Sequence, residues 1–231
     1  MKSTELISEF SRYPLFTIND VEDFVGMGKR GYAKLLVHRL MKNGILFHIS
    51  KGIYTLHNDP LIFGTHITYP SYFSLWTALR YYDITTQLPN EIYVMSPRSK
   101  KDLVFVGERI DFLKTKLMWG YHKENYMNFE IFMADKEKLV IDALYFKAVP
   151  FYEVTAAIKV CNKKRLADYC IKANKRSIIK RVGYVLERIG CPSSALLDHA
   201  RDRNIIPLNP LLPKRGRIDR NWCVYINEAI E

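Results

Sequence analysis

The chain has 231 residues, of which 48% are hydrophobic, so it can form one large domain or two to three small ones, each with its own core. It contains no apolar run near the roughly 18 residues that a membrane span needs, and its N-terminus lacks the layout of a signal peptide. We therefore expect a cytoplasmic protein. Its formal charge of +11 points to a polyanionic partner.

The positive charge is distributed unevenly, and this suggests three regions. Lys and Arg outnumber Asp and Glu by three in residues 1–58, equal them in 59–150 and exceed them by eight in 151–231. The sequence predicts an α+β protein. Its parts would be an N-terminal winged helix-turn-helix domain in 1–58, a central α+β domain in 59–150 and a basic, mainly helical region in 151–231.

The first region begins with two short predicted helices. Ser3 to Phe10 has the apolar spacing of one helix, and a second is expected from Asp20 to Val25. Asn19 is a suitable N-cap for the second helix, and Glu22 is placed to complete a capping box. The glycines that follow Val25 should end this helix.

A longer helix is expected from Lys29 to the Asn43-Gly44 pair, where glycine favours termination. Its apolar positions recur at the spacing of one helical face: Ala33, Leu36, Val37 and Leu40. The basic residues of this helix then fall on the opposite face or in the first turn: Lys29, Arg30, Lys34, His38 and Lys42. This is where a recognition helix contacts DNA.

Two strands should follow, Ile45 to Ile49 and Ile53 to Leu56, with Lys51 at the tip of the hairpin between them. The order of helices and hairpin is that of a winged helix-turn-helix, so the sequence predicts binding to double-stranded DNA. No acidic residue occurs between Lys29 and Lys51. Two alternatives remain open: a solvated helix face and a protein-docking module.

The predicted DNA contacts divide into two kinds. Arg30 and Lys34 are expected at base edges, because Arg and Lys recognise guanine acceptors in the major groove. The others are expected at phosphates: Lys29, His38, Lys42 and Lys51.

The glycines from Gly26 to Gly31 also spell G-x-G-x-x-G, the dinucleotide-binding pattern. That motif must follow a strand, whereas here a capped helix precedes it, and Lys51 stands about 20 residues on, where an acidic ribose ligand is needed. We expect no Rossmann site and no cofactor.

The central region is predicted to be a helix, several mostly antiparallel strands and a second helix. The first helix is expected from Pro70 to Tyr82 with Ser71 as its cap, and the last from Lys136 to Phe146 with Asp135 as its cap. The strands between them should cover residues 91–95, 103–106, a stretch near 112, 117–121 and 129–133.

The C-terminal region should form four helices, at 153–160, 163–172, 177–189 and 193–203, and a closing strand at 222–226. Basic residues in these helices offer a second candidate surface, which could bind RNA or an acidic protein: Lys163, Lys164, Arg165, Lys172, Lys175, Arg176, Lys180 and Arg181. The alternative is that these are ordinary solvated helix faces.

The sequence shows no catalytic or metal-binding pattern. It has no phosphate-binding loop, no H-E-x-x-H and no G-x-S-x-G, and its four cysteines and six histidines lack zinc spacing. No Asp or Glu has a Lys two residues after it, as a restriction-type nuclease would need. We expect no metal and no enzyme activity, with a nuclease as the remaining alternative.

Five segments stand in order along the chain: Lys51 to Tyr54, Pro70 to Leu79, Ala134 to Asp142, Arg181 to Gly190 and Trp222 to Asn227. In this order they resemble segments of the antitoxins of AbiE-type (type IV) abortive-infection toxin-antitoxin systems. In the third segment Asp135 stands where that family usually has proline.

The resemblance implies a repressor that binds inverted repeats in its own promoter through the winged helix. It also implies an antitoxin that opposes a nucleotidyltransferase-like toxin, with no stable complex between the two proteins expected. A solitary winged-helix regulator is the alternative within this architecture.

Overall fold

The computed structural model describes residues 2–230, which group into two compact units. The first comprises the chain up to residue 72 together with 90–114 and 123–132, and the second comprises 73–89, 115–122 and the chain from 133 onward. The protein is mixed α+β, as predicted. The division of the sequence at residues 58 and 150 stays a prediction.

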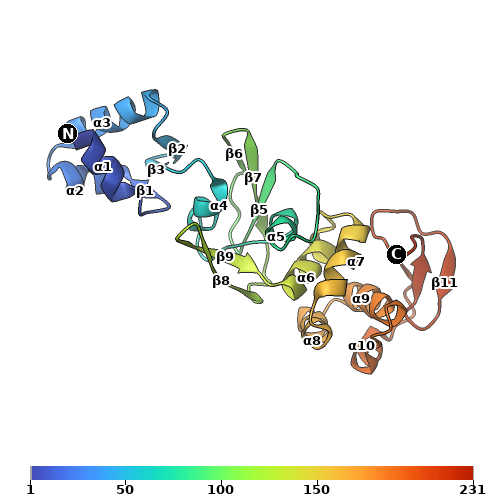
Figure 1. Ribbon diagram of the computed structural model, residues 1–231. Coiled ribbons are helices and arrows are strands. Elements are labelled where there is room, and N and C mark those ends of the chain that lie inside the picture. Colours follow the sequence, from blue (N-terminus) through green and yellow to red (C-terminus); the bar gives the residue numbers. More distant parts are fainter. Residues whose placement is uncertain (1, 231) are drawn as a thin grey trace. The chain divides into compact units, whose positions relative to one another are not determined.

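Residues 2–55 of unit one form three helices and three short strands (Figure 1). The elements are α1 (Lys2–Phe10), β1 (Phe16–Thr17), α2 (Ile18–Val25), α3 (Arg30–Lys42), β2 (Phe47–Ser50) and β3 (Ile53–Thr55). The strands pair in the order β1-β3-β2. The core cluster is Leu6, Phe10, Phe16, Val21, Val25, Ala33, Leu36, Val37, Leu40 and Leu46. The apolar periodicity of the sequence therefore located these helices correctly.

The cap of α2 differs from the expected Asn19. Thr17 has an extended backbone, and its Oγ1 accepts a hydrogen bond from the Asp20 amide at 3.3 Å. In return the Asp20 carboxylate accepts from the Thr17 amide at 2.6 Å. The capping box therefore lies two residues earlier than predicted, and Asn19 and Glu22 become available for other contacts.

A six-stranded sheet has the strand order β6-β7-β5-β4-β9-β8. Its strands are β4 (Tyr72–Phe73), β5 (Glu91–Ser96), β6 (Leu103–Phe105), β7 (Glu108–Lys114), β8 (Tyr121–Tyr126) and β9 (Phe129–Ala134). The prediction of mostly antiparallel strands is wrong for two pairs, since β5 with β7 and β4 with β9 are parallel. The strand expected at 117–121 is also wrong, because pairing begins only at Tyr121.

The helix expected from Pro70 to Tyr82 is shorter. The short helix α4 (Pro60–Phe63) and the 3-10 turn Gly64–His66 come first, and β4 then occupies the predicted start. Ser71 does not cap a helix. Its hydroxyl donates to the carbonyl oxygens of Thr65 and Thr68 at 2.7 and 2.8 Å. Helix α5 (Trp76–Tyr81) begins five residues later than Ser71.

Unit two is largely helical, with α6 (Lys136–Phe146), α7 (Phe151–Val160), α8 (Lys163–Ala173), α9 (Arg176–Arg188) and α10 (Ser194–Ala200). Asp135 caps α6, as predicted. Ser193 caps α10, which ends before residue 203. A three-stranded sheet of β10 (Ile206–Pro207), β12 (Val224–Ile226) and β11 (Arg217–Asp219) completes this unit. The prediction contained only its closing strand.

The closing segment is held by close packing against α9. Trp222 is buried, and a Cβ added at Gly183 would lie 2.0 Å from its ring. The glycine in the middle of α9 is thus required for close approach of the indole. Within residues 2–230 no helix is long and apolar enough to cross a membrane.

Candidate nucleic-acid interface

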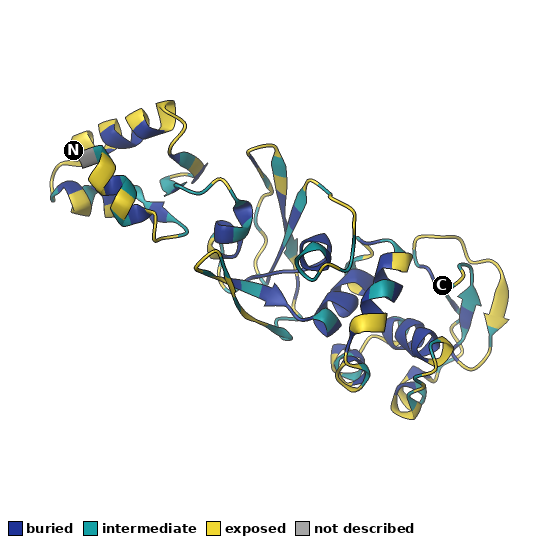
Figure 2. Cartoon of the chain, in the orientation of Figure 1, coloured by how far each residue is buried: buried dark blue, intermediate teal, exposed yellow. Residues whose placement is uncertain are grey.

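Helix α3 divides cleanly into a buried face and an exposed face (Figure 2). Its four predicted core residues are all less than 5% exposed. The predicted DNA-contacting residues of this helix and its first turn are all exposed: Lys29, Arg30, Lys34, His38 and Lys42. The structure therefore presents these side chains to solvent along one element.

Arg30 is the one member of this set for which an ion pair is found among the described residues. Its guanidinium donates to the Glu22 carboxylate and to the Asn19 side-chain oxygen, both at 3.1 Å. Arg30 nevertheless keeps about half of its side-chain surface exposed. These contacts join the start of α3 to α2 and restrict where the guanidinium points.

The hairpin of β2 and β3 presents Lys51 at its tip. Lys51 is exposed, and Gly52 beside it has a φ of +75°, a conformation that glycine adopts at low cost. The Gly52 carbonyl accepts from the Ile18 amide at 3.1 Å. This bond fixes the hairpin tip against the start of α2, so the position of Lys51 is set by backbone contacts.

Two further residues of the exposed α3 face were missed in the sequence analysis. Leu35 is 45% exposed, and Arg39 is exposed on the same outward side. A 100° step per residue places Leu35 close to the point directly opposite the buried stripe. The signal was therefore present in the helical periodicity. Leu35 was missed because the prediction considered only basic residues on that side, and Arg39 was left out although it is basic.

Charge on this N-terminal part is separated by element. All five acidic residues of the first 58 positions lie on α1 and α2: Glu5, Glu9, Asp20, Glu22 and Asp23. Helix α3 and the β2–β3 hairpin carry basic side chains and no carboxylate. An anionic polymer would therefore meet no acidic side chain from these two elements.

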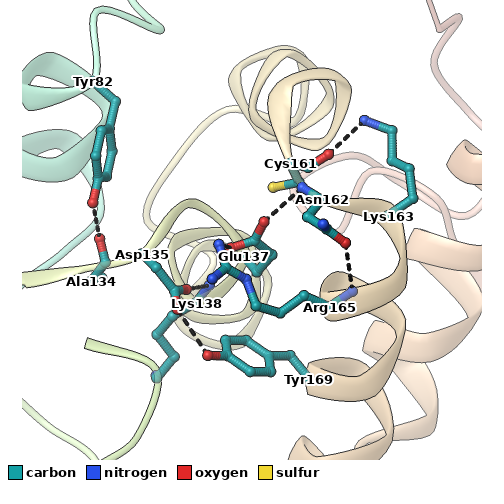
Figure 3. A network of polar contacts seen from close by, with 10 residues as sticks. All are labelled: Tyr82, Ala134, Asp135, Glu137, Lys138, Cys161, Asn162, Lys163, Arg165 and Tyr169. Carbon is teal, nitrogen blue, oxygen red and sulfur yellow. Dashed lines mark hydrogen bonds and ion pairs between the residues drawn. The ribbon is translucent and has the colours of Figure 1, made fainter. Parts of the chain in front are cut away.

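The basic residues predicted on α8 and α9 are largely engaged in internal contacts. The Lys163 ammonium donates to the carbonyl oxygens of Ile158, Lys159 and Cys161 at 2.7, 2.6 and 3.0 Å, which satisfies the C-terminal end of α7. Arg165 pairs with the buried Glu137 at 2.6 Å (Figure 3). These two cations therefore hold the helices together.

A second group of contacts surrounds the start of α6 in Figure 3. Tyr169 donates to the Asp135 carboxylate at 2.8 Å. Burial raises the pKa of Asp135, and burial together with the Asp135 hydrogen bond raises the pKa of Tyr169 to about 12. Lys172 lies 4.8 Å from the centre of the Trp119 ring, within cation–π range.

Two of the predicted surface residues are buried, which corrects their assignment to an exposed face. Lys180 is 1% exposed and pairs with Asp202, whose pKa this hydrogen bond lowers. Arg181 is 5% exposed, and its Nε donates to the Pro207 and Leu208 carbonyl oxygens at 3.1 Å each. Burial lowers the pKa of Arg181 to about 10.

The remaining predicted residues of this surface are exposed, and they differ in how many contacts they make with the rest of the chain. Lys175 lies 5.9 Å from the Tyr145 ring centre, and Arg176 is 3.9 Å from the Asp202 carboxylate. For Lys164 no ion pair or hydrogen bond is found in the described part of the chain. Tyr184 of α9 is buried.

The cysteines do not form a reactive or metal-binding group. All four are free thiols, and burial raises the pKa of Cys161 to about 12. Among residues 2–230 no three His, Cys, Asp or Glu side chains are grouped so that they could hold a metal ion.

Comparison with protein-family profiles finds no match, and comparison with curated proteins finds none either. The crystal structure of the RV2827C protein from Mycobacterium tuberculosis is similar to this chain, with a TM-score of 0.67 over 96% of this chain and 90% of that one. The two sequences are 11% identical, so the similarity is one of fold. It supports the α+β class over nearly the whole length.

Proposed function

We propose that residues 1–58 are a winged helix-turn-helix domain and that the protein is a sequence-specific transcriptional regulator that binds double-stranded DNA. One observation carries this proposal. A helix with a fully buried apolar stripe exposes its basic side chains on the other side, and the hairpin that follows carries an exposed lysine at its tip. Phosphate contacts by such cations supply most of the affinity of DNA-binding proteins.

In this proposal α3 is the recognition helix and Lys51 contacts a phosphate from the hairpin. Arg30 and Lys34 read base edges, and Lys29, His38 and Lys42 contact phosphates, as the sequence suggested. Leu35 joins them as an apolar contact for a thymine methyl group, and Arg39 as a further phosphate contact. The Arg30–Glu22 pair orients the guanidinium before DNA arrives.

The test is footprinting of the purified chain on the DNA upstream of its own gene at two salt concentrations. We expect a protected inverted repeat that persists at the higher salt. Its half-sites should lie about one or two helical turns apart if two copies bind. Diffuse protection that disappears with salt would contradict the proposal.

Two variants divide the contacts further. Arg30→Ala should relax sequence preference, with a cost of about 1–3 kcal/mol on the operator, while Lys51→Ala should weaken binding to all sequences and lower the salt slope by about one. Lys101→Ala, on an exposed lysine of another region, is the matched control. Equal losses on operator and random DNA for both variants would refute this division.

The resemblance to AbiE-type antitoxins extends the proposal to a non-enzymatic autorepressor and antitoxin in the cytoplasm. Its toxin would be nucleotidyltransferase-like and would not form a stable complex with it. The exposed cations of α8 and of the turn before α9 that form no ion pair among the described residues are the candidate antitoxic surface: Lys164, Lys172 and Lys175. Reversal of these three charges should abolish protection against such a toxin in co-expressing cells, while operator binding persists. A divalent-metal nuclease screen tests the enzymatic alternative.

A further inference from the structure

An apolar groove lies between α1 and α2. Its volume is about 390 Å³, within the range of sites that take up apolar side chains. The lining residues are Glu9, Phe10, Tyr13, Leu15, Phe16, Asp20, Asp23 and Phe24. None of them belongs to α3 or to the hairpin, so the groove is separate from the candidate DNA-binding face.

The rings at the base of the groove form a fixed wall, and two of them reach the surface. Phe10 packs against Phe16 at 4.5 Å and edge-on against Phe24 at 5.7 Å between ring centres. Tyr13 and Phe24 remain exposed. Exposed aromatic side chains around a concave apolar site are typical of a surface that binds another protein.

The charged residues of the groove lining are all acidic. Three carboxylates contribute to it and no basic residue does. Asp20 is committed to the cap of α2, whereas Glu9 and Asp23 form no ion pair within the described residues. The groove therefore favours an occupant that combines an apolar side chain with positive charge.

Another part of this chain has that chemistry. The loop Leu211–Arg217 exposes two leucines, 51% and 37% exposed, followed by the exposed Lys214 and Arg215. No ion pair of Lys214 or Arg215 is found in the part of the chain that the structure describes. The proposed DNA-binding and antitoxic surfaces do not use this loop.

The conformation of the loop is held by hydrogen bonds and by close packing. The Asn227 side-chain amide donates to the Leu212 and Pro213 carbonyl oxygens at 3.3 and 3.1 Å. Gly216 has a φ of +97°, and a Cβ there would lie 2.3 Å from the Ile226 carbonyl oxygen. The loop is thus held before it meets a partner, which lowers the entropy cost of binding.

We propose that the loop Leu211–Arg217 of one copy of this chain binds in the α1–α2 groove of a second copy. A leucine enters between the rings, and Lys214 and Arg215 lie against Glu9 and Asp23. Contact between two grooves is disfavoured, because it would bring like charges together. The contact joins different surfaces of the two copies and does not depend on DNA binding.

The test uses the full chain without DNA and two charge-reversed variants. Glu9→Lys with Asp23→Lys changes the groove and leaves the cap residue Asp20 intact, and Lys214→Glu with Arg215→Glu changes the loop. Wild type should associate in the micromolar range by sedimentation equilibrium. Each variant alone should associate at least about tenfold more weakly, because like charges now face each other.

The decisive measurement is mixing. The groove variant has a basic groove and a wild-type loop. The loop variant has an acidic loop and a wild-type groove. A mixture should therefore regain association through one wild-type contact. The chain carrying all four substitutions should also regain it through reversed pairs. A misfolded variant would be rescued by neither route.

The matched control is Lys101→Glu with Lys116→Glu, which changes the net charge as much as the loop variant does and should leave association unchanged. If the wild-type chain stays monomeric up to roughly 200 µM, the proposal is overturned, because even a small transient interface would be populated at that concentration. Equal weakening by the control pair, or failure of the mixture to associate, would overturn it as well. Operator footprinting is independent of all these outcomes.

Discussion

The two basic regions of this protein differ in what their cations contact. On α3 and the hairpin tip the cations are exposed, and of the residues predicted there only Arg30 has an ion pair among the described side chains. On α8 and α9 the cations satisfy helix ends, pair with buried carboxylates or reach strand carbonyls. The cations of α3 and the hairpin tip can therefore contact a ligand, whereas most of those on α8 and α9 stabilise the fold.

This difference shows why net charge misdirects a search for a binding surface. Residues 151–231 carry the largest excess of Lys and Arg, yet Lys180 and Arg181 are buried and Lys163 is bound to three carbonyl oxygens. The N-terminal region has a smaller excess, but its acidic residues are confined to other helices. Phosphate binding requires exposed and unengaged cations, which a count cannot identify.

The largest effect that tests this comparison is expected at Arg181. Arg181→Ala removes the side-chain donor to the carbonyl oxygens of Pro207, Leu208 and Ser177, and it removes a buried side chain. We expect the free energy of unfolding to fall by about 3 kcal/mol, as measured by urea denaturation.

Lys164→Ala is the control for Arg181→Ala, because Lys164 is an exposed cation of the same region. Its effect should lie within about 0.5 kcal/mol of zero. If Arg181→Ala lowers the free energy of unfolding by less than about 1 kcal/mol, the buried guanidinium is not needed for stability. The proposed difference between the two basic regions would then be wrong for the residue with the most internal contacts.

The sequence predicted elements well where one local pattern decides them. The apolar stripe of α3, the Asp135 cap of α6 and the strands β5 and β9 were all expected from spacing and capping chemistry. Each depends on residues that are close in sequence. Parallel pairing of β5 with β7 depends on how distant segments meet, so alternation within one strand could not indicate it.

The burial of Lys180 and Arg181 could not be predicted for the same reason. Their partners are Asp202 and the carbonyls of β10, more than 20 residues away. Helical periodicity places both cations off the apolar stripe of α9, which is correct, but a second packed element covers that side too. The exposure of the basic residues of α3 was predicted correctly, because these positions stay exposed within residues 2–230. Their contact with DNA stays a prediction.

The next largest effect is expected on operator affinity, which should respond to a substitution on α3 but not to one on α8. Lys34→Ala removes an exposed cation that we assign to a base edge, so affinity for the operator should fall by about 1–3 kcal/mol in fluorescence anisotropy. Lys172→Ala removes a cation that lies over Trp119 and should change operator affinity less than about twofold. Comparable losses for both variants would place DNA on unit two as well.

A smaller effect is expected at Leu35, the apolar residue of the exposed α3 face. Leu35→Ala removes an exposed side chain that we assign to a thymine methyl group, and this should cost about 1 kcal/mol on the operator. The cost should vanish on an operator in which uracil replaces thymine, since uracil lacks the methyl group. Loss of the same size on both DNAs would mean that Leu35 contributes to packing and not to base recognition.

The smallest effect concerns the ion pair that connects α2 to α3. Glu22→Gln weakens the hold on Arg30, and because exposed pairs are worth about 0.2–1 kcal/mol, folding stability should change by no more than that. The freed guanidinium and the loss of one negative charge should raise affinity for random DNA by roughly two- to threefold. Discrimination between operator and random DNA should fall, since Arg30 is then less well oriented. If discrimination is unchanged, the pair only neutralises charge, and the orientation of Arg30 is set by DNA itself.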